Sequence, residues 1–412
     1  MVLWSLVLAS AAAPAVAATP ATQKEAADLS GDLDLDTLIA AVLASNPEAA
    51  MAQATLARSQ ALAQAAGPWP DPMVDLGVAP MSLGGMPGWQ LSARQDLPLW
   101  GSQRTARLMA LADADAAAAR RAMMHLELAD MAAMAWSDWY AQHRELELVA
   151  WSLRMLQADR EAGLSRFAAG RASQQEVLQV EAEIASLVVT QRSLETERDL
   201  TAVRLNTLLN RDPAGALPAP PASLARPEAL APEQARPERA EALAMTQAAE
   251  AGVRMARIDR LPMLGLMVGW DSMATMPDAR LMTGLSVSVP LAMRRRAAAV
   301  DAAQAELSWS HAELDRVTAA VGQDVAEAER RYTGQLAVLD VLQTQLLPVT
   351  RARVEADRAA YASGTGDVRL LLESERAFLD AQIRQQRALA SLQLRAAQLC
   401  LARGQLPTGD RL

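Results

Sequence analysis

The sequence predicts a mainly α-helical protein that carries four short β-strands and consists of two similar halves. Ala, Leu, Gln, Glu and Arg dominate, and only 3% of the residues are aromatic, a composition typical of long helices packed as coiled coils. Two segments alternate apolar and polar residues and end at Pro98 and Pro290, as strands do before a residue that cannot donate to the ladder. A long helical tract follows each of these prolines.

Composition and targeting signals narrow the class of protein. The 412 residues carry a net charge of −9, which argues against a nucleic-acid partner. Residues 1–18 contain an apolar run and the tripeptide Ala15-Val16-Ala17, so we expect a cleaved signal peptide, with a short membrane anchor as the alternative. Cys400 is the sole cysteine, and no intrachain disulfide can form. Outside the signal, no stretch reaches the roughly 18 apolar residues of a membrane-spanning helix.

The first predicted repeat covers residues 19–210. A helix over residues 34–66 is interrupted at Asn46-Pro47, where proline suits the first turn of a new helix. A β-hairpin follows at 73–99 and then a helical hairpin. The first arm of that hairpin has about 60 residues and a length of roughly 90 Å. The turn is expected near 163–173, and Val177, Val180, Ile184, Leu187, Gln191 and Leu194 form a heptad seam in the second arm.

A proline-rich linker over residues 211–237 precedes the second repeat, 238–404. This repeat has a helix to Arg260, a β-hairpin at 263–291 and a helical tract kinked at Pro348. A turn near 361–367 and a last helix follow, and residues 405–412 form a tail.

Constant offsets between landmarks predict an internal duplication. Pro47 and Pro237 are 190 residues apart, as are Pro72 and Pro262, and Gly170 and Gly364 are 194 apart. Each half therefore supplies one β-hairpin and one long helical hairpin.

The strands predict a shared membrane barrel. One face of each is apolar and the other is polar, small or Met, which is the alternation of a barrel with lipid outside and water inside. Four strands cannot enclose a channel, whereas three copies would supply twelve. A soluble sheet packed under helices is the alternative. The residues expected to face the lumen are Met73, Asp75, Gln90, Ser92, Arg94, Asp96, Met263, Met267 and Met282.

Several short motifs, in this order, resemble the TolC-type outer-membrane efflux family. They are Asn46-Pro47-Glu48, Pro70-Asp71-Pro72, Asp96-Leu97-Pro98-Leu99, Phe167-Ala168-Ala169-Gly170 and Tyr361-Ala362-Ser363-Gly364. The resemblance implies a homotrimer with a twelve-stranded barrel in the outer-membrane lipid and a twelve-helix tunnel across the periplasm. It further implies a periplasmic adaptor at the tunnel tips and an inner-membrane pump of the RND type.

The two predicted helical turns are the candidate adaptor-docking tips. Glycine permits the backbone conformation that ends a helix and reverses the chain. Asp367 can cap the following helix or place negative charge near the tunnel mouth. The tip residues are Arg166, Gly170, Ser173, Tyr361, Gly364, Gly366 and Asp367.

No catalytic constellation or cofactor motif is present in the sequence. His125, His143 and His311 are scattered over helical tracts, and the sequence has no glycine-rich loop that would bind phosphate. We therefore expect that the protein is not an enzyme and that a partner supplies the energy for its function.

The 19 methionines are the main indication of a cargo. Thioethers are soft ligands, so Met73, Met263, Met267 and Met282 could form a weak relay for Cu(I) or Ag(I); the alternative is that Met only fills space. The short first loop after Pro70-Asp71-Pro72 resembles the heavy-metal branch of the family. A multidrug or type I secretion duct, a periplasmic coiled-coil adaptor and a structural surface protein remain competing interpretations.

Overall fold

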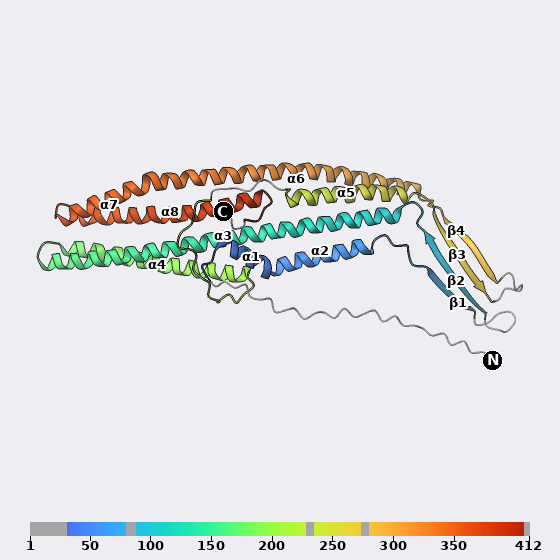
Figure 1. The fold of residues 1–412 in the computed structure, drawn as a ribbon, viewed down its shortest axis with the longest axis horizontal. Helices are drawn as coiled ribbons and strands as arrows, with labels where there is room; N and C mark the ends of the chain where they lie inside the picture. Colours follow the sequence, from blue (N-terminus) through green and yellow to red (C-terminus); the bar gives the residue numbers. More distant parts are fainter. Residues whose placement is uncertain (1–30, 80–87, 228–234, 273–279, 408–412) are drawn as a thin grey trace, which may run out of the picture.

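A computed structural model describes residues 31–79, 88–227, 235–272 and 280–407. The expected signal peptide, the ends of both β-hairpins with Met81, Met86, Met273 and Met276, and residues 408–412 lie outside the described residues. The molecule is elongated, with the strands at one end and two helix-to-helix turns at the other (Figure 1).

Long helices make up most of the described chain. The longest, α3, has 67 residues and so extends about 100 Å. The helices of the first half are α1 (Leu35–Ser45), α2 (Pro47–Ala65), α3 (Ser102–Ala168) and α4 (Gln174–Leu208). Those of the second half are α5 (Pro237–Ile258), α6 (Met293–Val341), the π-helical turn η2 (Leu342–Leu346), α7 (Leu347–Ala362) and α8 (Val368–Ala402).

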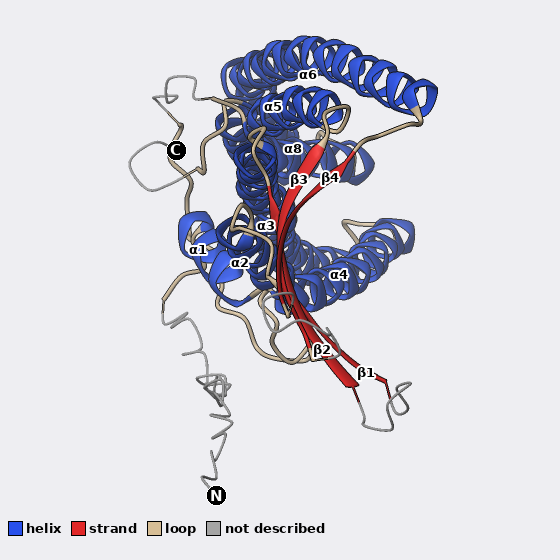
Figure 2. Ribbon diagram, turned by 90° about the vertical axis from the view of Figure 1, so that its right-hand side faces the viewer, coloured by secondary structure: helices blue, strands red, loops and turns tan. Residues whose placement is uncertain are grey.

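The four strands form one antiparallel sheet in the order β1-β2-β3-β4. Hairpin β1 (Met73–Ala79) and β2 (Gly88–Leu97) comes from the first half, and hairpin β3 (Met263–Asp271) and β4 (Leu281–Ser288) from the second. Strand β2 pairs with β3, which joins the halves into one curved ribbon (Figure 2). The prediction of a mainly helical fold with four strands is confirmed.

A buried core lies near the middle of the long axis, where α1, α3 and the proline-rich segment meet. Trp136 is 1% exposed and donates its indole N–H to the Leu33 carbonyl at 2.7 Å. Trp139 donates to the Pro218 carbonyl at 3.2 Å, and the Tyr332 hydroxyl donates to the Pro227 carbonyl at 3.1 Å. Prolines lack an N–H but keep a carbonyl that can accept a hydrogen bond. The described part of the predicted linker, residues 211–227, is therefore bound to the helices, and we call it the strap.

Helices α2 and α5 each begin where a long helix ends. Asn46, the residue before α2, accepts a hydrogen bond from the Glu48 N–H at 2.8 Å and donates through Nδ2 to the Leu208 carbonyl of α4 at 3.0 Å. Arg236, the residue before α5, donates to the Leu401 and Ala402 carbonyls at the end of α8 at 3.1 and 2.9 Å. These contacts satisfy terminal carbonyls that a helix leaves without partners. They join α4 to α2 and α8 to α5 end to end.

One expectation about a helix boundary needs correction. Gly163 does not begin the first turn: it is buried within α3, and a Cβ there would meet only Val177 of α4, at 3.8 Å. The turn is therefore shorter than 163–173. Near Pro348, where the sequence predicts a kink, the helical tract continues through the π turn η2 just before the proline, since a π turn accommodates the missing N–H and the ring.

Candidate functional site

The register of the sheet places every predicted lumen-facing residue on one face. Residues paired across antiparallel strands point to the same side. Met73 pairs with Arg94, and Arg94 with Met267. Asp75 pairs with Ser92, Ser92 pairs with Gly269, and Gly269 pairs with Met282. Gln90, Asp96 and Met263 occupy the same alternate positions. This polar face contains Met, Gly, Ser and charged residues in cross-strand rows.

The opposite, apolar face is continuous across all four strands. Leu76 pairs with Leu91, Leu91 with Trp270, and Trp270 with Leu281. The polar exception on β2 is Gln95, whose side-chain amide donates to the Pro70 carbonyl at 2.7 Å. The hydrogen bond satisfies the amide at the edge of an otherwise apolar surface.

Ion pairing and close packing organise the polar face near its helical end. Arg94 and Asp96 form an ion pair at 3.3 Å along β2. Gly265 lies between Asp96 and Ser286 in the pairing. A Cβ at Gly265 would lie 2.6 Å from the Ser286 Oγ and 3.1 Å from the Asp96 Oδ1. The two polar side chains thus occupy the space above a residue that has none.

At the far end of the molecule, the first turn ends α3 with a left-handed glycine. Gly170 has φ 69°, its N–H donates to the Phe167 carbonyl at 2.9 Å, and the Arg171 N–H donates to the Arg166 carbonyl at 2.8 Å. This is a glycine C-cap. Ser173 then begins α4 with a capping box shared with Glu176.

The second turn has a similar construction between α7 and α8. Gly364 has φ 78°, and the N–H groups of Thr365 and Gly366 both donate to the Ala360 carbonyl, at 3.0 and 2.9 Å. A Cβ at Gly366 would lie 2.8 Å from the Tyr361 backbone nitrogen, so any larger residue would displace the turn. Asp367 is the N-cap of α8 and accepts from the Arg369 N–H at 2.9 Å.

The two turns touch each other through Arg166 and Tyr361. The guanidinium carbon of Arg166 lies 4.3 Å from the centre of the Tyr361 ring, within the range of a cation–π contact. Tyr361 is 9% exposed, and burial raises the pKa of its hydroxyl, opposed by the charge of Arg166. The structure therefore brings together two tip residues that lie 195 positions apart in the chain.

Behind the turns lies a partly buried group of charges that the sequence did not single out. Arg358 of α7 donates to the Glu375 carboxylate of α8 at 2.5 Å. Burial raises the pKa of Glu375, and the negative charge of Asp159 raises it further. Burial also raises the pKa of Asp159, opposed by Arg358. Across the groove between α4 and α8, Arg376 pairs with Glu183. Such residues resemble ordinary solvated helix charges in the sequence, so only the packing of the two hairpins reveals them.

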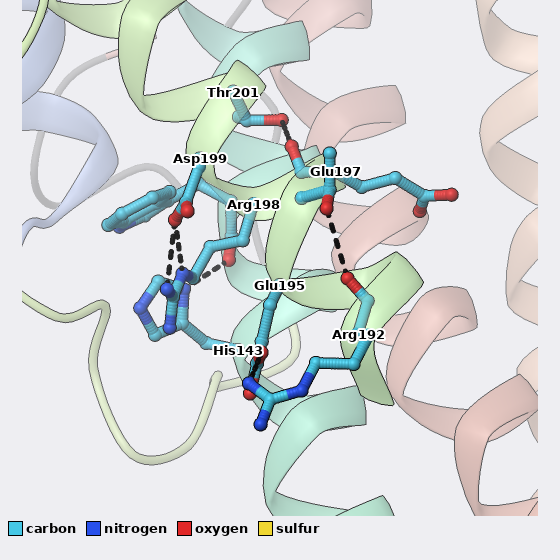
Figure 3. A network of polar contacts seen from close by, with 9 residues as sticks. His143, Arg192, Glu195, Glu197, Arg198, Asp199 and Thr201 are labelled. Atoms are coloured by element: carbon cyan, nitrogen blue, oxygen red, sulfur yellow. Dashed lines mark hydrogen bonds and ion pairs between the residues drawn. The ribbon is translucent and has the colours of Figure 1, made fainter. Parts of the chain in front are cut away.

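One histidine belongs to a polar network beside the strap (Figure 3). His143 has its Nδ1 2.8 Å from the Trp139 carbonyl and lies edge-on to the Trp139 ring, with centroids 4.1 Å apart. Burial lowers the pKa of His143. Arg198 and Asp199 form their own ion pair at 2.8 Å, so the network is a packing arrangement between α3, α4 and the strap.

The described residues contain neither a cluster of metal ligands nor a membrane-spanning helix. No group of three or more His, Cys, Asp and Glu residues in the described ranges could hold a metal ion. None of the described helices is long and apolar enough to cross a membrane.

The fold is that of outer-membrane channels. The structure of CusC, described by its conformational changes on folding and transmembrane channel formation, aligns with a TM-score of 0.78 and 18% identity, covering 91% of this chain and 92% of that one. The open-state MtrE outer-membrane channel of Neisseria gonorrhoeae aligns with a TM-score of 0.76 and 20% identity, covering 90% and 89%.

The sequence comparisons agree with this fold. Residues 232–405 match the outer membrane efflux protein family. The pyoverdine export outer membrane protein OpmQ of Pseudomonas putida is 29% identical over 326 residues, which cover 74% of this chain and 68% of OpmQ. The predicted resemblance to the TolC-type outer-membrane efflux family is confirmed. The similar proteins OpmQ and MtrE are, by their descriptions, an outer membrane protein and an outer-membrane channel.

Proposed function

We propose that this protein is the exit duct of a tripartite efflux system. Three copies form a twelve-stranded barrel in the outer membrane, continued by a tunnel of long helices through the periplasm. The duct is passive: an inner-membrane pump, taken to be of the RND type, supplies the energy, and a periplasmic adaptor connects the two. The match of residues 232–405 to the outer membrane efflux protein family and the fold of the chain support this proposal.

The observation that carries the proposal is the sheet at the end of the helices. One face is apolar and the other polar, and among the described strands β1 and β4 each pair on one side only. An exposed strand edge is unfavourable in water and untenable in lipid. Pairing β4 of one copy with β1 of the next removes every edge.

Cross-linking across the proposed strand contact tests the assembly. Within one chain, β1 and β4 are separated by two strands, which is about 14 Å at the usual strand spacing. In a Cys400→Ala background, Leu76→Cys with Leu285→Cys should therefore cross-link between chains and yield covalent trimers with a short thiol reagent.

The matched control uses residues that pair within one chain. Leu76→Cys with Leu91→Cys occupies facing positions on β1 and β2 and should yield cross-linked monomers only. If the Leu76/Leu285 pair also gave only monomers while the control cross-linked fully, the shared barrel would be rejected.

The two turns are the proposed docking region for the adaptor. The Phe167 side chain is 47% exposed there, and both turns lie together at the end farthest from the sheet (Figure 1). The Arg166–Tyr361 contact holds them side by side. Cross-linking from Arg171→Cys to the co-expressed adaptor should fail when the cysteine is moved to Gln90, on the sheet.

The cargo has two candidate classes. The relative OpmQ carries pyoverdine export in its name, which favours an organic cargo. Soft metal ions are the second candidate, because Met73, Met263, Met267 and Met282 share the polar face. Arg94 separates Met73 from Met267 in their cross-strand row, and its positive charge opposes a cation between these two thioethers.

Tolerance assays distinguish the two classes. A strain that lacks the protein is complemented with the wild-type gene or with a variant that has all four methionines changed to Leu. Loss of copper and silver tolerance in the variant alone, with export of organic compounds kept, would support the metal cargo. Unchanged metal tolerance in the deletion strain would reject it.

A further inference from the structure

The four segments that connect the strands to the helices are rich in arginine. Residues 66–72, 98–107, 254–262 and 289–296 together contain eight arginines and two acidic residues, Asp71 and Asp259. The whole chain has more acidic than basic residues, 48 against 39, so this local excess does not follow from composition. Seven of these arginines are exposed and form the arginine collar: Arg104, Arg107, Arg254, Arg257, Arg260, Arg294 and Arg295.

Hydrogen bonds hold the four connecting segments together at the base of the sheet. The Trp100 indole N–H donates to the Pro262 carbonyl at 2.7 Å, and the Gln103 side-chain amide donates to the Pro68 carbonyl at 3.0 Å. Arg296 donates to the Asp259 carbonyl. The collar residues therefore lie on connected segments, at the helix ends that adjoin the strands (Figure 1).

No residue in the described part of the chain forms an ion pair with the collar. Elsewhere on the helices many arginines pair with Asp or Glu, such as Arg316 with Glu313 and Arg331 with Glu327. Two of the helices that begin in the collar, α3 and α6, have no acidic residue in the first turn, whereas α2, α4 and α5 each have a Glu there. The collar thus presents uncompensated positive charge.

Exposed apolar and aromatic side chains place this charge at a membrane surface. Trp69 and Trp100 are 61% and 46% exposed at the helical end of the sheet, and tryptophan favours the boundary between hydrocarbon and headgroups. Arg104 lies in the first turn of α3, four residues beyond Trp100 in the chain. The headgroup layer adjoins the hydrocarbon boundary and is roughly 5–8 Å thick on each side, so a collar arginine this near to Trp100 can reach it.

We infer that the arginine collar binds anionic phospholipid headgroups of the periplasmic leaflet. The guanidinium group matches phosphate in charge and in bidentate geometry, and the apolar face of the sheet continues directly into the collar. Bound lipid fixes the height at which the barrel becomes the tunnel. This inference depends on the outer-membrane location of the protein and not on its cargo or adaptor.

Thermal unfolding of the assembled full-length protein tests the inference in detergent micelles that contain phosphatidylglycerol or phosphatidylcholine. Phosphatidylglycerol should raise the unfolding midpoint of the wild-type protein, and phosphatidylcholine should not. The collar variant Arg104→Gln/Arg294→Gln/Arg295→Gln should need at least about tenfold more phosphatidylglycerol for the same shift, since each arginine near an anionic surface contributes about fivefold in affinity.

The control variant Arg154→Gln/Arg211→Gln/Arg330→Gln removes the same charge from exposed arginines away from the sheet and should respond like the wild type. Trimer migration on a gel, recorded in parallel, reports any failure of assembly separately. Equal lipid responses in the two variants would overturn the inference, as would an equal shift with inorganic phosphate. A changed ion selectivity of the collar variant with an unchanged lipid response would also overturn it, because the arginines would then face the water-filled lumen.

Discussion

Arg166 and Tyr361 connect the turn of the first helical hairpin to the turn of the second, with 4.3 Å between the guanidinium carbon and the ring centre. They form the contact through which the two turns support each other, because the turns themselves are closed by separate sets of backbone hydrogen bonds. Loss of this contact should therefore loosen both turns at once and leave the rest of the helices unchanged.

The first prediction concerns the Tyr361 ring. Tyr361→Leu should increase hydrogen exchange of amides in both turns by at least about two- to fivefold, the equivalent of about 0.5–1 kcal/mol, which is the lower range for a cation–π contact. Tyr361→Phe is the control, because it keeps the ring over which Arg166 lies, and its exchange should match the wild type. Exchange that rose in only one turn would contradict the shared role of the contact.

The second prediction is a pH dependence of the same end of the molecule. The folded-state pKa values of Asp159 and Glu375 are both raised by burial. A raised pKa means that the folded state binds protons more tightly than the unfolded state, so the stabilisation is complete at low pH and is lost as pH rises through the raised values. Acidification from neutral pH towards the usual carboxyl pKa of about 4 should therefore raise the protection factors of the turn amides, which compare each exchange rate with the intrinsic rate at the same pH.

Substitution of Glu375 tests the cause of this pH dependence. Glu375→Gln keeps an acceptor for Arg358 but cannot ionise, so it should slow exchange at neutral pH and flatten the pH profile. Glu373, two residues away, is largely exposed and pairs with Arg353 at 3.0 Å. Glu373→Gln should leave the profile unchanged, and a similar flattening in both variants would exclude burial as the cause.

The third prediction concerns the end-to-end contact of α4 and α2. Asn46→Ala removes both the cap of α2 and the donor to the Leu208 carbonyl, and should lower the free energy of unfolding by about 1–2 kcal/mol. Asn46→Asp keeps the acceptor for the Glu48 N–H and loses only the donor, so its effect should be intermediate. Urea titration measures both. If Asn46→Ala were as stable as the wild type, the contact between Asn46 and Leu208 would not stabilise the fold.

Local patterns in the sequence predicted the strands, their two faces and the positions of the turns. Alternation fixed the strand faces because the side-chain period of a strand is two residues, and Gly170 and Gly364 marked the turns because only glycine adopts their φ values without strain. What the sequence could not reveal depends on pairs distant in the chain. Asn46 with Leu208 is separated by 162 residues, and Gln393 with the Ala225 carbonyl by 168. These contacts turn a predicted linker into a strap and two pairs of helices into continuous rods.

The fourth prediction concerns close packing on the polar face. Gly265→Ala would place a Cβ 2.6 Å from the Ser286 Oγ and should destabilise the sheet by about 1–3 kcal/mol, as overpacking does. Gly284→Ala is the control on the neighbouring strand, since its Cβ would meet only the Met267 Cε at 3.7 Å. Heat-modifiable migration of the assembled protein should be lost at a lower temperature in the first variant alone.

The fifth prediction assigns lipid and water to the two faces of the sheet. Leu91 lies in the cross-strand row with Leu76 and Trp270, whereas its neighbour Ser92 lies in the row with Asp75 and Gly269. Leu91→Arg places a charge on the apolar face and should cost about 2–4 kcal/mol if the residue lies near the bilayer midplane. Ser92→Arg adds the same charge to the polar face, where water solvates it, and should leave assembly nearly normal. The amount of trimer in the outer-membrane fraction reports both. Normal assembly of Leu91→Arg together with loss of Ser92→Arg would reverse the faces, and would place the methionine residues of the polar face against lipid instead of water.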